Sequence, residues 1–497
     1  MGVAEVIYTV RRRLALEILD LEPIPDPPPP RAEWPAWTSE NASANQDVRL
    51  RVLSLNAWAL PIAPKCTERA VEIANAIQEG YDIVTFQEIW HRRERNIIIT
   101  RAEQAGYHYY HYFQPAVGFP LPLGAGAFGT GLLVVSKFPI VSAMYHPFSL
   151  SGRPYALHEA DFVANKGVGL LRVQTPAGQF DLYVTHLIAN YNYLGRPGPG
   201  DRYLAHRITQ SYELARFINA TNRNDLTVVC GDFNSPDDCL VLGIPRELVQ
   251  LRDAFTDMNS HDGLTFATED NIYSHGDHPM RMDYVLYKMT QQANDTPGWH
   301  LVGSDVFKGY FTDAKGQEFP LSDHFGVTAE FVFGSRPLPL KPCQQALGET
   351  SKEQSSPVAK NVPTCPTTTC MHCDELKAQT DGVKLTEDGY TRTVRLLQDI
   401  QQACLDGQAA AFFSRSAHLR RCAISAFLLL CLLVVHAIGL MSLSNWSWVA
   451  ILLLVLTIIV QYVLAFFYIT LELSSFMEMS NQVRLHLHAE QANQAVL

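Results

Sequence analysis

Residues 226–234 read Leu-Thr-Val-Val-Cys-Gly-Asp-Phe-Asn, a hydrophobic run that ends in a carboxylate and an amide. The β-branched residues of this run predict a buried strand from Leu226 to Gly231. The turn that follows presents Asp232 and Asn234 at the end of the strand. These two residues are therefore candidates for a functional site at one edge of a sheet.

The same arrangement of a hydrophobic strand with a polar end recurs along the chain. Predicted strands over residues 48–55, 82–86 and 180–186 end at Asn56, Glu88 and His186, and Asp323 and His324 precede a strand over 326–333. Further strands are predicted at 132–136, 168–173 and 282–287, with a long helix over 202–219. Many short strands with helices between them predict an α/β fold of two packed sheets flanked by helices.

A helix is also predicted between the first two strands. Its residues Ala70, Ile73, Ala74 and Ile77 fall on one face, and Thr67 is a suitable capping residue. Thr67 is therefore expected at the N-cap of this helix.

The polar side chains at the strand ends have the chemistry needed to hydrolyse a phosphodiester. Carboxylates and amides are the hard oxygen ligands that Mg²⁺ prefers, and imidazoles titrate near neutral pH. Metal-assisted hydrolysis needs a cation, a base that activates water and stabilisation of the leaving oxygen. Taken singly, each residue is equally well explained as part of a turn. Their order and spacing favour the functional interpretation.

Six short motifs stand in the order typical of the endonuclease/exonuclease/phosphatase superfamily, which residues 48–335 resemble. They are Asn56, Gln87-Glu88, Thr185-His186, Gly231-Asp232-Phe233-Asn234, Arg281-Met282-Asp283-Tyr284 and Ser322-Asp323-His324. The resemblance implies a four-layered α/β sandwich with the active site at one edge of the paired sheets.

The resemblance also implies a Mg²⁺ site. Glu88 is similar to the principal Mg²⁺ ligand of the superfamily, and Asn56 stands beside it. Asp323 corresponds either to a ligand of a second metal or to a residue that supports His324.

The remaining motif residues correspond to the groups that carry out the hydrolysis. His324 resembles the general base, and Asp283 the carboxylate that orients it. Asp232 and Asn234 resemble the pair that positions the attacking water and the phosphate. His186 resembles the second histidine, which binds the phosphate and can protonate the leaving alkoxide.

Two segments resemble the membrane-bound neutral sphingomyelinases within that superfamily. They are residues 161–167, in which Lys166 is expected to approach the phosphate, and 201–207, which lead into the long helix. An exposed charge at a strand edge is the alternative explanation of Lys166. The resemblance implies hydrolysis of sphingomyelin to ceramide and phosphocholine at the surface of a phospholipid bilayer.

The sequence leaves other substrates open, namely a lysophospholipid, a phosphoinositide or, in a nuclease, a nucleic acid. The formal net charge is −11, and the chain has no long run of Lys or Arg. Binding a nucleic acid needs clustered positive charge, so no nucleic-acid partner is expected.

Two hydrophobic segments, Ala423–Met441 and Trp448–Ile469, each approach the ~20 residues that cross a bilayer. A short loop joins them, which predicts a transmembrane hairpin, with a buried pair of core helices as the alternative. Arg415, Arg420 and Arg421 flank the first span and indicate that both ends lie in the cytosol. The chain is expected in the endoplasmic reticulum or another endomembrane, with a cytosolic catalytic domain.

Composition divides the chain into six parts. They are an N-terminal helix with a Pro-rich connector (1–46), a catalytic domain (47–335), a flexible linker (336–382), a juxtamembrane helix (383–422), the hairpin (423–470) and a cytosolic tail (471–497). The linker holds Cys365, Cys370 and Cys373, which are either free thiols or a zinc site. The apolar loop 115–130 is either a lipid-contacting surface or a packed loop.

Overall fold

The computed structural model describes residues 48–60, 63–78, 80–114, 129–153, 156, 159, 161–162, 164–191, 201–274, 278–290, 297–334, 389–439 and 445–496. The expected N-terminal helix, most of the apolar loop 115–130 and the three linker cysteines lie outside the described residues.

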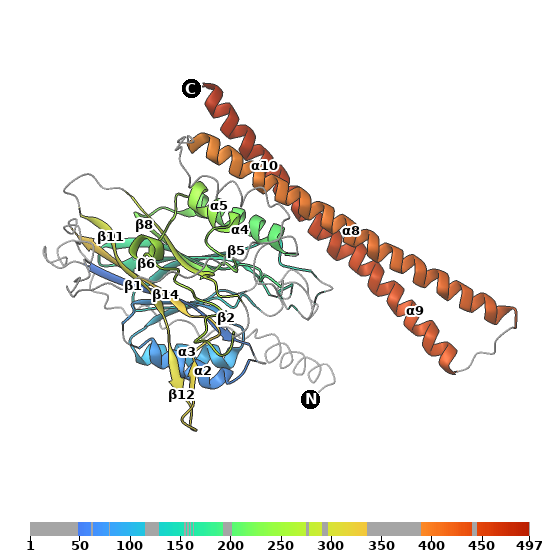
Figure 1. Cartoon of the computed structure of the whole chain (residues 1–497), viewed down its shortest axis with the longest axis horizontal. Helices are drawn as coiled ribbons and strands as arrows, with labels where there is room; N and C mark the ends of the chain where they lie inside the picture. Colours follow the sequence, from blue (N-terminus) through green and yellow to red (C-terminus); the bar gives the residue numbers. More distant parts are fainter. Residues whose placement is uncertain are drawn as a thin grey trace, which may run out of the picture.

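Two six-stranded sheets form the centre of the catalytic domain (Figure 1). The first has the order β11 (Gly298–Phe307), β14 (Gly326–Gly334), β1 (Val48–Ala59), β2 (Ile83–Ile89), β4 (Leu133–Ser136) and β3 (Tyr109–Tyr112). The second has the order β5 (Ile140–Pro147), β6 (Gly167–Thr175), β7 (Gly178–His186), β8 (Leu226–Asp232), β10 (Asp283–Met289) and β9 (Arg252–Asp253). A separate pair, β12 (Tyr310–Thr312) and β13 (Glu318–Pro320), projects from the domain.

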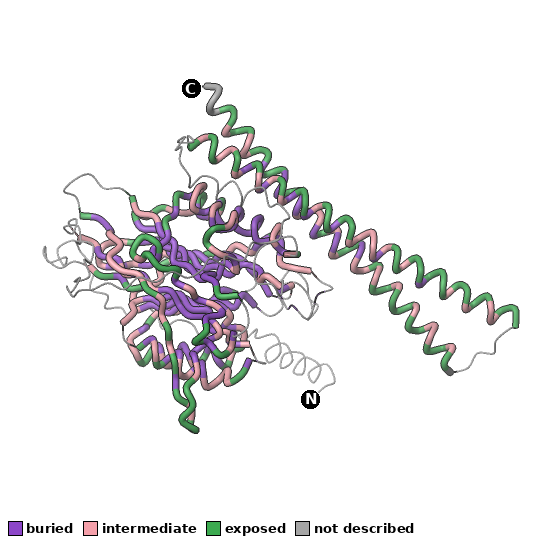
Figure 2. The backbone as a smooth tube through the Cα atoms, in the orientation of Figure 1, coloured by how far each residue is buried: buried purple, intermediate pink, exposed green. Residues whose placement is uncertain are grey.

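Alternation along the strands explains why the domain has four layers. In β1, Leu50 and Val52 lie in the core between the two sheets, whereas Leu53 and Leu55 lie in the core under the outer helices. Successive side chains of a strand point to opposite faces, so each sheet has two faces to bury. Figure 2 shows both sheets as buried layers.

Helices complete the outer layers. The first sheet is covered by α2 (Cys66–Ala76) and α3 (Arg92–Gln104), and the second by α4 (Leu204–Thr221) and α5 (Leu240–Leu248). A short helix, α6 (Ala254–Met258), follows β9. The predicted four-layered α/β sandwich is confirmed.

The helix between β1 and β2 begins one residue earlier than its predicted cap. α2 starts at Cys66, after Lys65, whose φ of 53° is left-handed and whose side chain makes no capping bond. The prediction of Thr67 as N-cap is therefore wrong. Its hydroxyl donates instead to Oε1 of Glu94 on α3 (2.6 Å) and joins the two helices. The predicted apolar face of α2 is correct, since its residues are buried.

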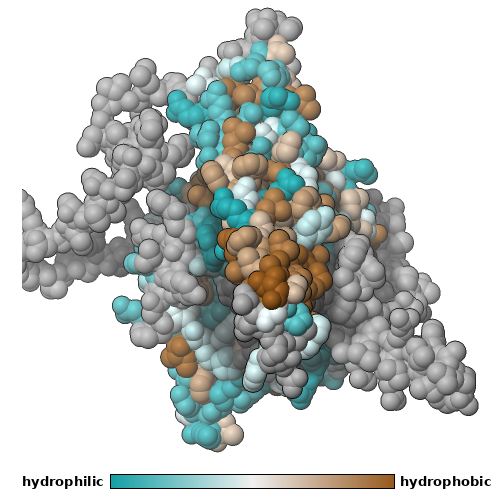
Figure 3. All heavy atoms as spheres, turned by 90° about the vertical axis from the view of Figure 1, so that its right-hand side faces the viewer, coloured by the Kyte–Doolittle hydropathy of each residue, from teal (hydrophilic) through white to brown (hydrophobic). Residues whose placement is uncertain are grey.

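Two long helices follow the catalytic domain and form a hairpin (Figure 1). α8 (Gly389–Ala437) runs outward, and α9 (Asn445–Val463), the π-helix η2 (Leu464–Tyr468) and α10 (Ile469–Val496) return alongside it. Both arms are long and apolar enough to cross a membrane. Hydrophobic side chains gather on the projecting end of the hairpin, which faces the viewer in Figure 3. The hairpin contains the predicted span Trp448–Ile469 and residues 423–439 of the other span, and it is consistent with membrane association.

α8 and α10 also contribute to the core of the catalytic domain. Leu397, Ile400 and Cys404 of α8 and Met479 and Val483 of α10 are at most 2% exposed. They belong to the same hydrophobic cluster as residues of α4 and α5. Because burial of apolar surface is the dominant favourable term in folding, the helices of the hairpin also stabilise the catalytic domain.

Replacing Ile400 with Ala is expected to lower the free energy of unfolding of the catalytic domain by about 2–5 kcal/mol, because the change leaves a cavity in the shared core. Leu405→Ala is the control, since Leu405 is 43% exposed on the same helix. Its effect should stay within about 0.5 kcal/mol. Denaturant unfolding of the full chain in detergent, followed by tryptophan fluorescence, measures both. Equal effects would show that α8 is not part of the core.

Candidate active site

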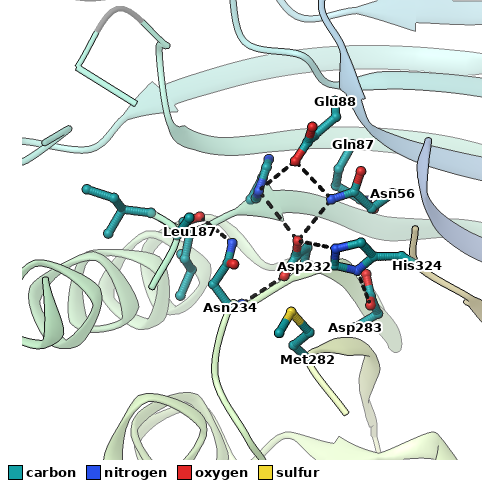
Figure 4. Close-up of polar contacts among 12 residues, drawn as sticks. Asn56, Gln87, Glu88, Leu187, Asp232, Asn234, Met282, Asp283 and His324 are labelled. Carbon is teal, nitrogen blue, oxygen red and sulfur yellow. Dashed lines mark hydrogen bonds and ion pairs between the residues drawn. The ribbon is translucent and has the colours of Figure 1, made fainter. Parts of the chain in front are cut away.

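The Asp232 carboxylate lies at the centre of a buried polar cluster at the strand ends (Figure 4). It ends β8, and strand pairing places His186 of β7 beside it. Nδ2 of Asn56 donates to its Oδ2 (3.0 Å), and the backbone N–H of Asn234 donates to its Oδ1 (2.8 Å). Nε2 of His186 lies 3.5 Å from Oδ2, and Nε2 of His324 lies 3.9 Å from it. Four segments of the chain therefore meet at one carboxylate.

The close approach of β7 to β8 depends on Gly231. A Cβ atom at this position would lie 2.3 Å from the carbonyl oxygen of Thr185. Glycine is the residue that tolerates such close contact with another backbone. The Gly-Asp-Phe-Asn motif therefore contains the residue that lets His186 reach Asp232.

Glu88 lies on the more exposed side of the cluster. Nδ2 of Asn56 donates to its Oε1 (3.2 Å), and Nε2 of His186 lies 3.9 Å from the same oxygen. The side chain of Glu88 is 18% exposed, whereas that of Asp232 is 1% exposed. Oδ1 of Asn56 accepts from the backbone N–H of Trp58 (3.0 Å), which turns Nδ2 toward the two carboxylates. Nδ2 of Asn56 therefore bridges Glu88 and Asp232.

Three residues at the cluster have left-handed backbone conformations. The angle φ is 44° at Trp58, 60° at Glu88 and 49° at Asn234. Such conformations cost about 1–3 kcal/mol each in non-glycine residues and persist where the surrounding structure enforces them, often at active sites. Glu88 and Asn234, the two predicted site residues among the three, are therefore held in place by the surrounding fold.

His324 and Asp283 form a buried pair on the other side of Asp232. Nδ1 of His324 lies 2.8 Å from Oδ2 of Asp283, which turns Nε2 toward Asp232. The ring packs against Phe266, with 4.8 Å between ring centres. Burial lowers the pKa of His324, but the carboxylates of Asp283, Asp323 and Asp232 together raise it well above its usual value.

Lys166 is buried beside His186. Its Nζ lies 2.9 Å from Nε2 of His186, 3.2 Å from Oδ1 of Asp161 and 5.8 Å from the ring centre of Trp90. Burial, followed by the charges of Lys166 and His324, lowers the pKa of His186 well below its usual value. His186 is therefore neutral at pH 7 and accepts a hydrogen bond from the ammonium. Because Lys166 is only 2% exposed, it is not a solvated charge at a strand edge.

Asp323 lies at the edge of the cluster. Its Oδ1 accepts from the hydroxyl of Ser322 (3.2 Å), and its backbone oxygen accepts from Ser274 (3.0 Å). Burial raises the pKa of Asp323 to about 6; His324 opposes this shift and Glu88 adds to it. Asp323 therefore interacts electrostatically with both residues, and its hydrogen bonds fix the turn before β14.

The cluster has the donor chemistry of a divalent cation site. Ligand atoms of Asp232, Asp283 and His324 all lie within 4.8 Å of one another. Burial and then the charge of Asp283 raise the pKa of Asp232 to about 7. Oδ1 of Asp283 has no hydrogen-bond partner among the described residues. A divalent cation supplies the positive charge that such buried carboxylates lack, so these residues fit one.

Two groups that shape the cluster were not predicted from the sequence. Asp161 holds Lys166, and the buried guanidinium of Arg69 donates to the carbonyl groups of Ala57 (2.8 Å) and Leu321 (3.1 Å). Arg69 thereby joins the segment after Asn56 to the one before Asp323. Asp161 could have been predicted as a partner of Lys166, because a carboxylate five residues before a lysine is visible in the sequence. Nothing in the sequence around Arg69 indicates its distant carbonyl partners.

The fold and the polar cluster, which fits a divalent cation, together point to the class of phosphodiesterases. Residues 53–324, more than half of the chain, match the Endonuclease/Exonuclease/phosphatase family. The chain belongs to that family.

Proteins that are named for the hydrolysis of sphingolipids are similar to this chain. Sphingomyelin phosphodiesterase 2 of Mus musculus is 31% identical over 311 residues, which cover 60% of this chain and 69% of the mouse protein. The human protein of the same name is 32% identical over 256 residues, covering 49% of this chain and 57% of its own length. Inositol phosphosphingolipids phospholipase C of Schizosaccharomyces pombe is 32% identical over 216 residues, covering 42% and 45%. The expected resemblance to neutral sphingomyelinases is confirmed.

Solved structures are also similar to the chain. Sphingomyelinase C from Streptomyces griseocarneus is 21% identical and covers 58% of this chain and 100% of that chain, with a TM-score of 0.44.

The affinity for a divalent cation is expected to fall as the pH is lowered from 8 to 6. With a pKa of about 7, the Asp232 carboxyl is largely deprotonated at pH 8 and largely protonated at pH 6. A cation that displaces this proton loses up to about tenfold in apparent affinity per pH unit below the pKa. Titration calorimetry of metal-stripped protein with Mg²⁺ at both pH values measures this.

Two variants sharpen the pH test. Asp232→Asn should remove most of the pH dependence, whereas Asp82→Asn, outside the cluster, should keep it. Equal pH dependence in the wild type and Asp232→Asn would show that the proton and the cation do not compete for this carboxyl.

Proposed function

We propose that this chain hydrolyses the phosphodiester of sphingomyelin, releasing phosphocholine and leaving ceramide in the membrane. The names of the mouse and human relatives support this substrate. The relative from Schizosaccharomyces pombe is named for inositol phosphosphingolipids. A sphingolipid with an inositol phosphate headgroup is therefore the second candidate substrate.

The observation that carries the proposal is the meeting of Glu88, Asn56, Asp232 and His324 around one point (Figure 4). Phosphodiester hydrolysis needs acidic groups that can hold a cation next to a base that can activate water. These side chains come from separate strands and loops. Asn56 and His324 lie within hydrogen-bond or ion-pair distance of Asp232, and Glu88 accepts a hydrogen bond from Asn56. This arrangement supports water attack on phosphorus.

We assign the general base to His324. Its Nδ1 is bound to Asp283, which orients Nε2. The neighbouring carboxylates raise the pKa of His324, so a cation held by them would offset their charge and leave Nε2 able to take a proton from the attacking water. Nδ2 of Asn234 donates to the carbonyl of Leu187 (2.9 Å), and its backbone holds Asp232, so this turn has a fixed position from which to orient the water and the phosphate. The water oxygen forms a new bond to phosphorus as its proton passes to His324, the bond from phosphorus to the ceramide oxygen breaks, and that oxygen takes a proton from the Lys166 ammonium.

We assign contact with the phosphate and the departing oxygen to Lys166 and His186. Hydrogen bonds from a charged donor to phosphate are roughly twice as strong as those between neutral groups. His186 is neutral, so the ammonium of Lys166 is the stronger donor to the ceramide oxygen that leaves. In this assignment His186 contacts the phosphate and holds the ammonium in place.

Mg²⁺ is the proposed cation, held by Glu88 with Asn56 and Asp323. To serve as a ligand, the amide of Asn56 must turn so that Oδ1, which accepts from Trp58, faces Glu88 in place of Nδ2. The greater exposure of Glu88 relative to Asp232 supports this choice. Asp283 and His324 are bonded to each other, which suits a base and its orienting group better than a pair of metal ligands. When bound, Mg²⁺ offsets the charge of the phosphate and stabilises the leaving oxygen.

We also propose that the hairpin anchors the catalytic domain on the cytosolic side of the endoplasmic reticulum or another endomembrane. Arg420 and Arg421 next to the first span support the cytosolic orientation. In this proposal, residues 336–382 are a connector between the domain and the juxtamembrane helix 383–422, and residues 471–497 return to the cytosol. The domain then meets its lipid substrate in the membrane that holds it.

The full-length protein in lipid–detergent micelles is expected to release phosphocholine from sphingomyelin with Mg²⁺ and to lose this activity in EDTA. Glu88→Gln should lower kcat at least about 100-fold, because a lost cation contact removes several kcal/mol of transition-state stabilisation. Glu94→Gln is the matched control, since Glu94 is also poorly exposed but bonds to Thr67 outside the cluster.

A lipid panel completes this experiment. Headgroup release is measured from sphingomyelin, an inositol phosphosphingolipid, lysophosphatidylcholine and phosphatidylinositol, and strand cleavage from DNA. Release from the inositol sphingolipid alone would select the second candidate. Turnover of DNA or of glycerolipids without turnover of any sphingolipid would refute the proposal.

Lys166→Ala is expected to lower kcat by about 10²–10³-fold, as for removal of one preorganised donor to a developing oxyanion. Lys137→Ala is the control, because Lys137 stacks on Tyr107 (5.0 Å) away from the cluster. Steady-state kinetics with Mg²⁺ measure both variants. A loss in Lys166→Ala no larger than in the control would remove Lys166 from the reaction.

A further inference from the structure

A carboxylate of the returning hairpin arm is buried against the catalytic domain. Glu472 lies on α10 and is 7% exposed. Its Oε1 lies 3.3 Å from Nε2 of His206 on α4 and 3.7 Å from Nε of Arg153 in the loop after β5. Its Oε2 has no hydrogen-bond partner among the described residues. Burying a carboxylate is costly unless nearby charges compensate, so this contact is specific rather than incidental.

Close packing fixes the position of Glu472. One helical turn further along α10, Phe476 lies against Gly407 of α8, where an added Cβ would come within 2.4 Å of the ring. The ring of Phe476 also packs edge-on against His206, with 5.1 Å between centres. α10 therefore cannot shift along α4 or α8 without losing these contacts, and the carboxylate stays opposite His206.

On the domain side, the partners of Glu472 surround Tyr203. The guanidinium of Arg153 stacks on the Tyr203 ring at 5.2 Å, and the His206 ring packs edge-on against it at 5.1 Å. The hydroxyl of Tyr203 donates to Oε2 of Glu159. The carboxylate of Glu472 thus pairs with the charge of Arg153 and lies beside the His206 ring, and the Tyr203 ring is clamped between these two groups.

From Glu159 the contacts continue to the candidate active site. The hydroxyl of Tyr191 donates to the backbone oxygen of Glu159 and to Oδ2 of Asp161 (2.9 Å). Oδ1 of Asp161 binds Nζ of Lys166 (3.2 Å), which in turn binds His186 (2.9 Å). An unbroken series of polar and ring contacts therefore joins α10 to the ammonium at the phosphate site.

We propose that Glu472 is a positioning residue for the reaction: it holds Arg153 and His206 so that Tyr203, Glu159 and Asp161 fix the Lys166 ammonium. The inference rests on the proposed function, because it gives Lys166 the contact with the phosphate. A contact series alone does not establish coupling, which requires that a change at one end alters the energetics at the other.

A double-mutant cycle between Glu472 and Lys166 tests the proposal in the full-length protein with Mg²⁺ and sphingomyelin. Glu472→Gln, which keeps the shape and removes the charge, is expected to lower kcat by about 2- to 30-fold with little change in KM. In the Lys166→Ala background the same change should alter kcat less than about twofold, because residues that act through each other are not additive.

His486→Gln is the matched control. His486 also joins α10 to α4, through the hydroxyl of Tyr212 (3.2 Å), but outside the contact series to Lys166. It should leave kcat within about twofold of wild type in both backgrounds, as expected for independent sites. Additive effects of Glu472→Gln and Lys166→Ala, or an equal loss in His486→Gln, would overturn the proposal and leave Glu472 as a docking contact.

A second readout does not depend on catalysis. Hydrogen exchange of backbone amides in residues 161–167 should speed up in Glu472→Gln and not in His486→Gln. If the wild type turns over no lipid, the proposed function fails, while the exchange experiment still decides whether Glu472 orders this segment. If Glu472→Gln does not fold, Arg153→Lys replaces it in both experiments. This change keeps the positive charge but loses the planar stacking on Tyr203. The expected and the contradicting results are the same as for Glu472→Gln.

Discussion

The repulsion among buried carboxylates around Asp232 is the constraint on which the rest of the site depends. Two unit charges 4 Å apart repel by about 4 kcal/mol at the effective dielectric constant of a protein near its surface. Asp232 and Asp283 are buried, Asp323 is half-buried at the edge of the same cluster, and the pKa of Asp232 and that of Asp323 are both raised. His324 relieves part of this repulsion. A divalent cation is the natural counter-charge for the remainder, which ties the fold of this edge to metal chemistry.

The register of the two sheets creates this concentration of charge. Each sheet contains one parallel pair, β1 with β2 and β7 with β8, and parallel strands end at the same edge. The pairing of Asn56 with Gln87 in one sheet and of His186 with Asp232 in the other places polar residues at matching heights. Packing the sheets face to face then joins the two edges, so one site is assembled from residues far apart in the sequence.

Periodicity was sufficient to predict the strands and the polar residues at their ends, because alternation and burial are local properties of sequence. Glu88, Asp232 and His324 could be singled out from the order and spacing of their motifs, because each alone is equally well explained as part of a turn. The protonation of His186 could not, since its pKa is lowered by its own burial and then by the charge of Lys166 beside it. Thr67 has the composition of a cap, yet the left-handed Lys65 starts the helix and Glu94 takes the hydroxyl. Such pairings are decided by tertiary contacts that no local pattern records.

Hydrophobic composition identified the hairpin arms as candidate spans but gave no indication of how they meet the catalytic domain. Leu397 and Ile400 of α8 and Val483 of α10 share one apolar cluster with α4, whose inner face packs on the second sheet. A flexible tether would leave the domain free to rotate above a bilayer. Because α4 is packed both against the sheet that carries Asp232 and against the hairpin, the direction of the two hydrophobic arms is fixed relative to the active site. Access of a lipid headgroup to the edge that carries Asp232 is therefore a property of the whole fold.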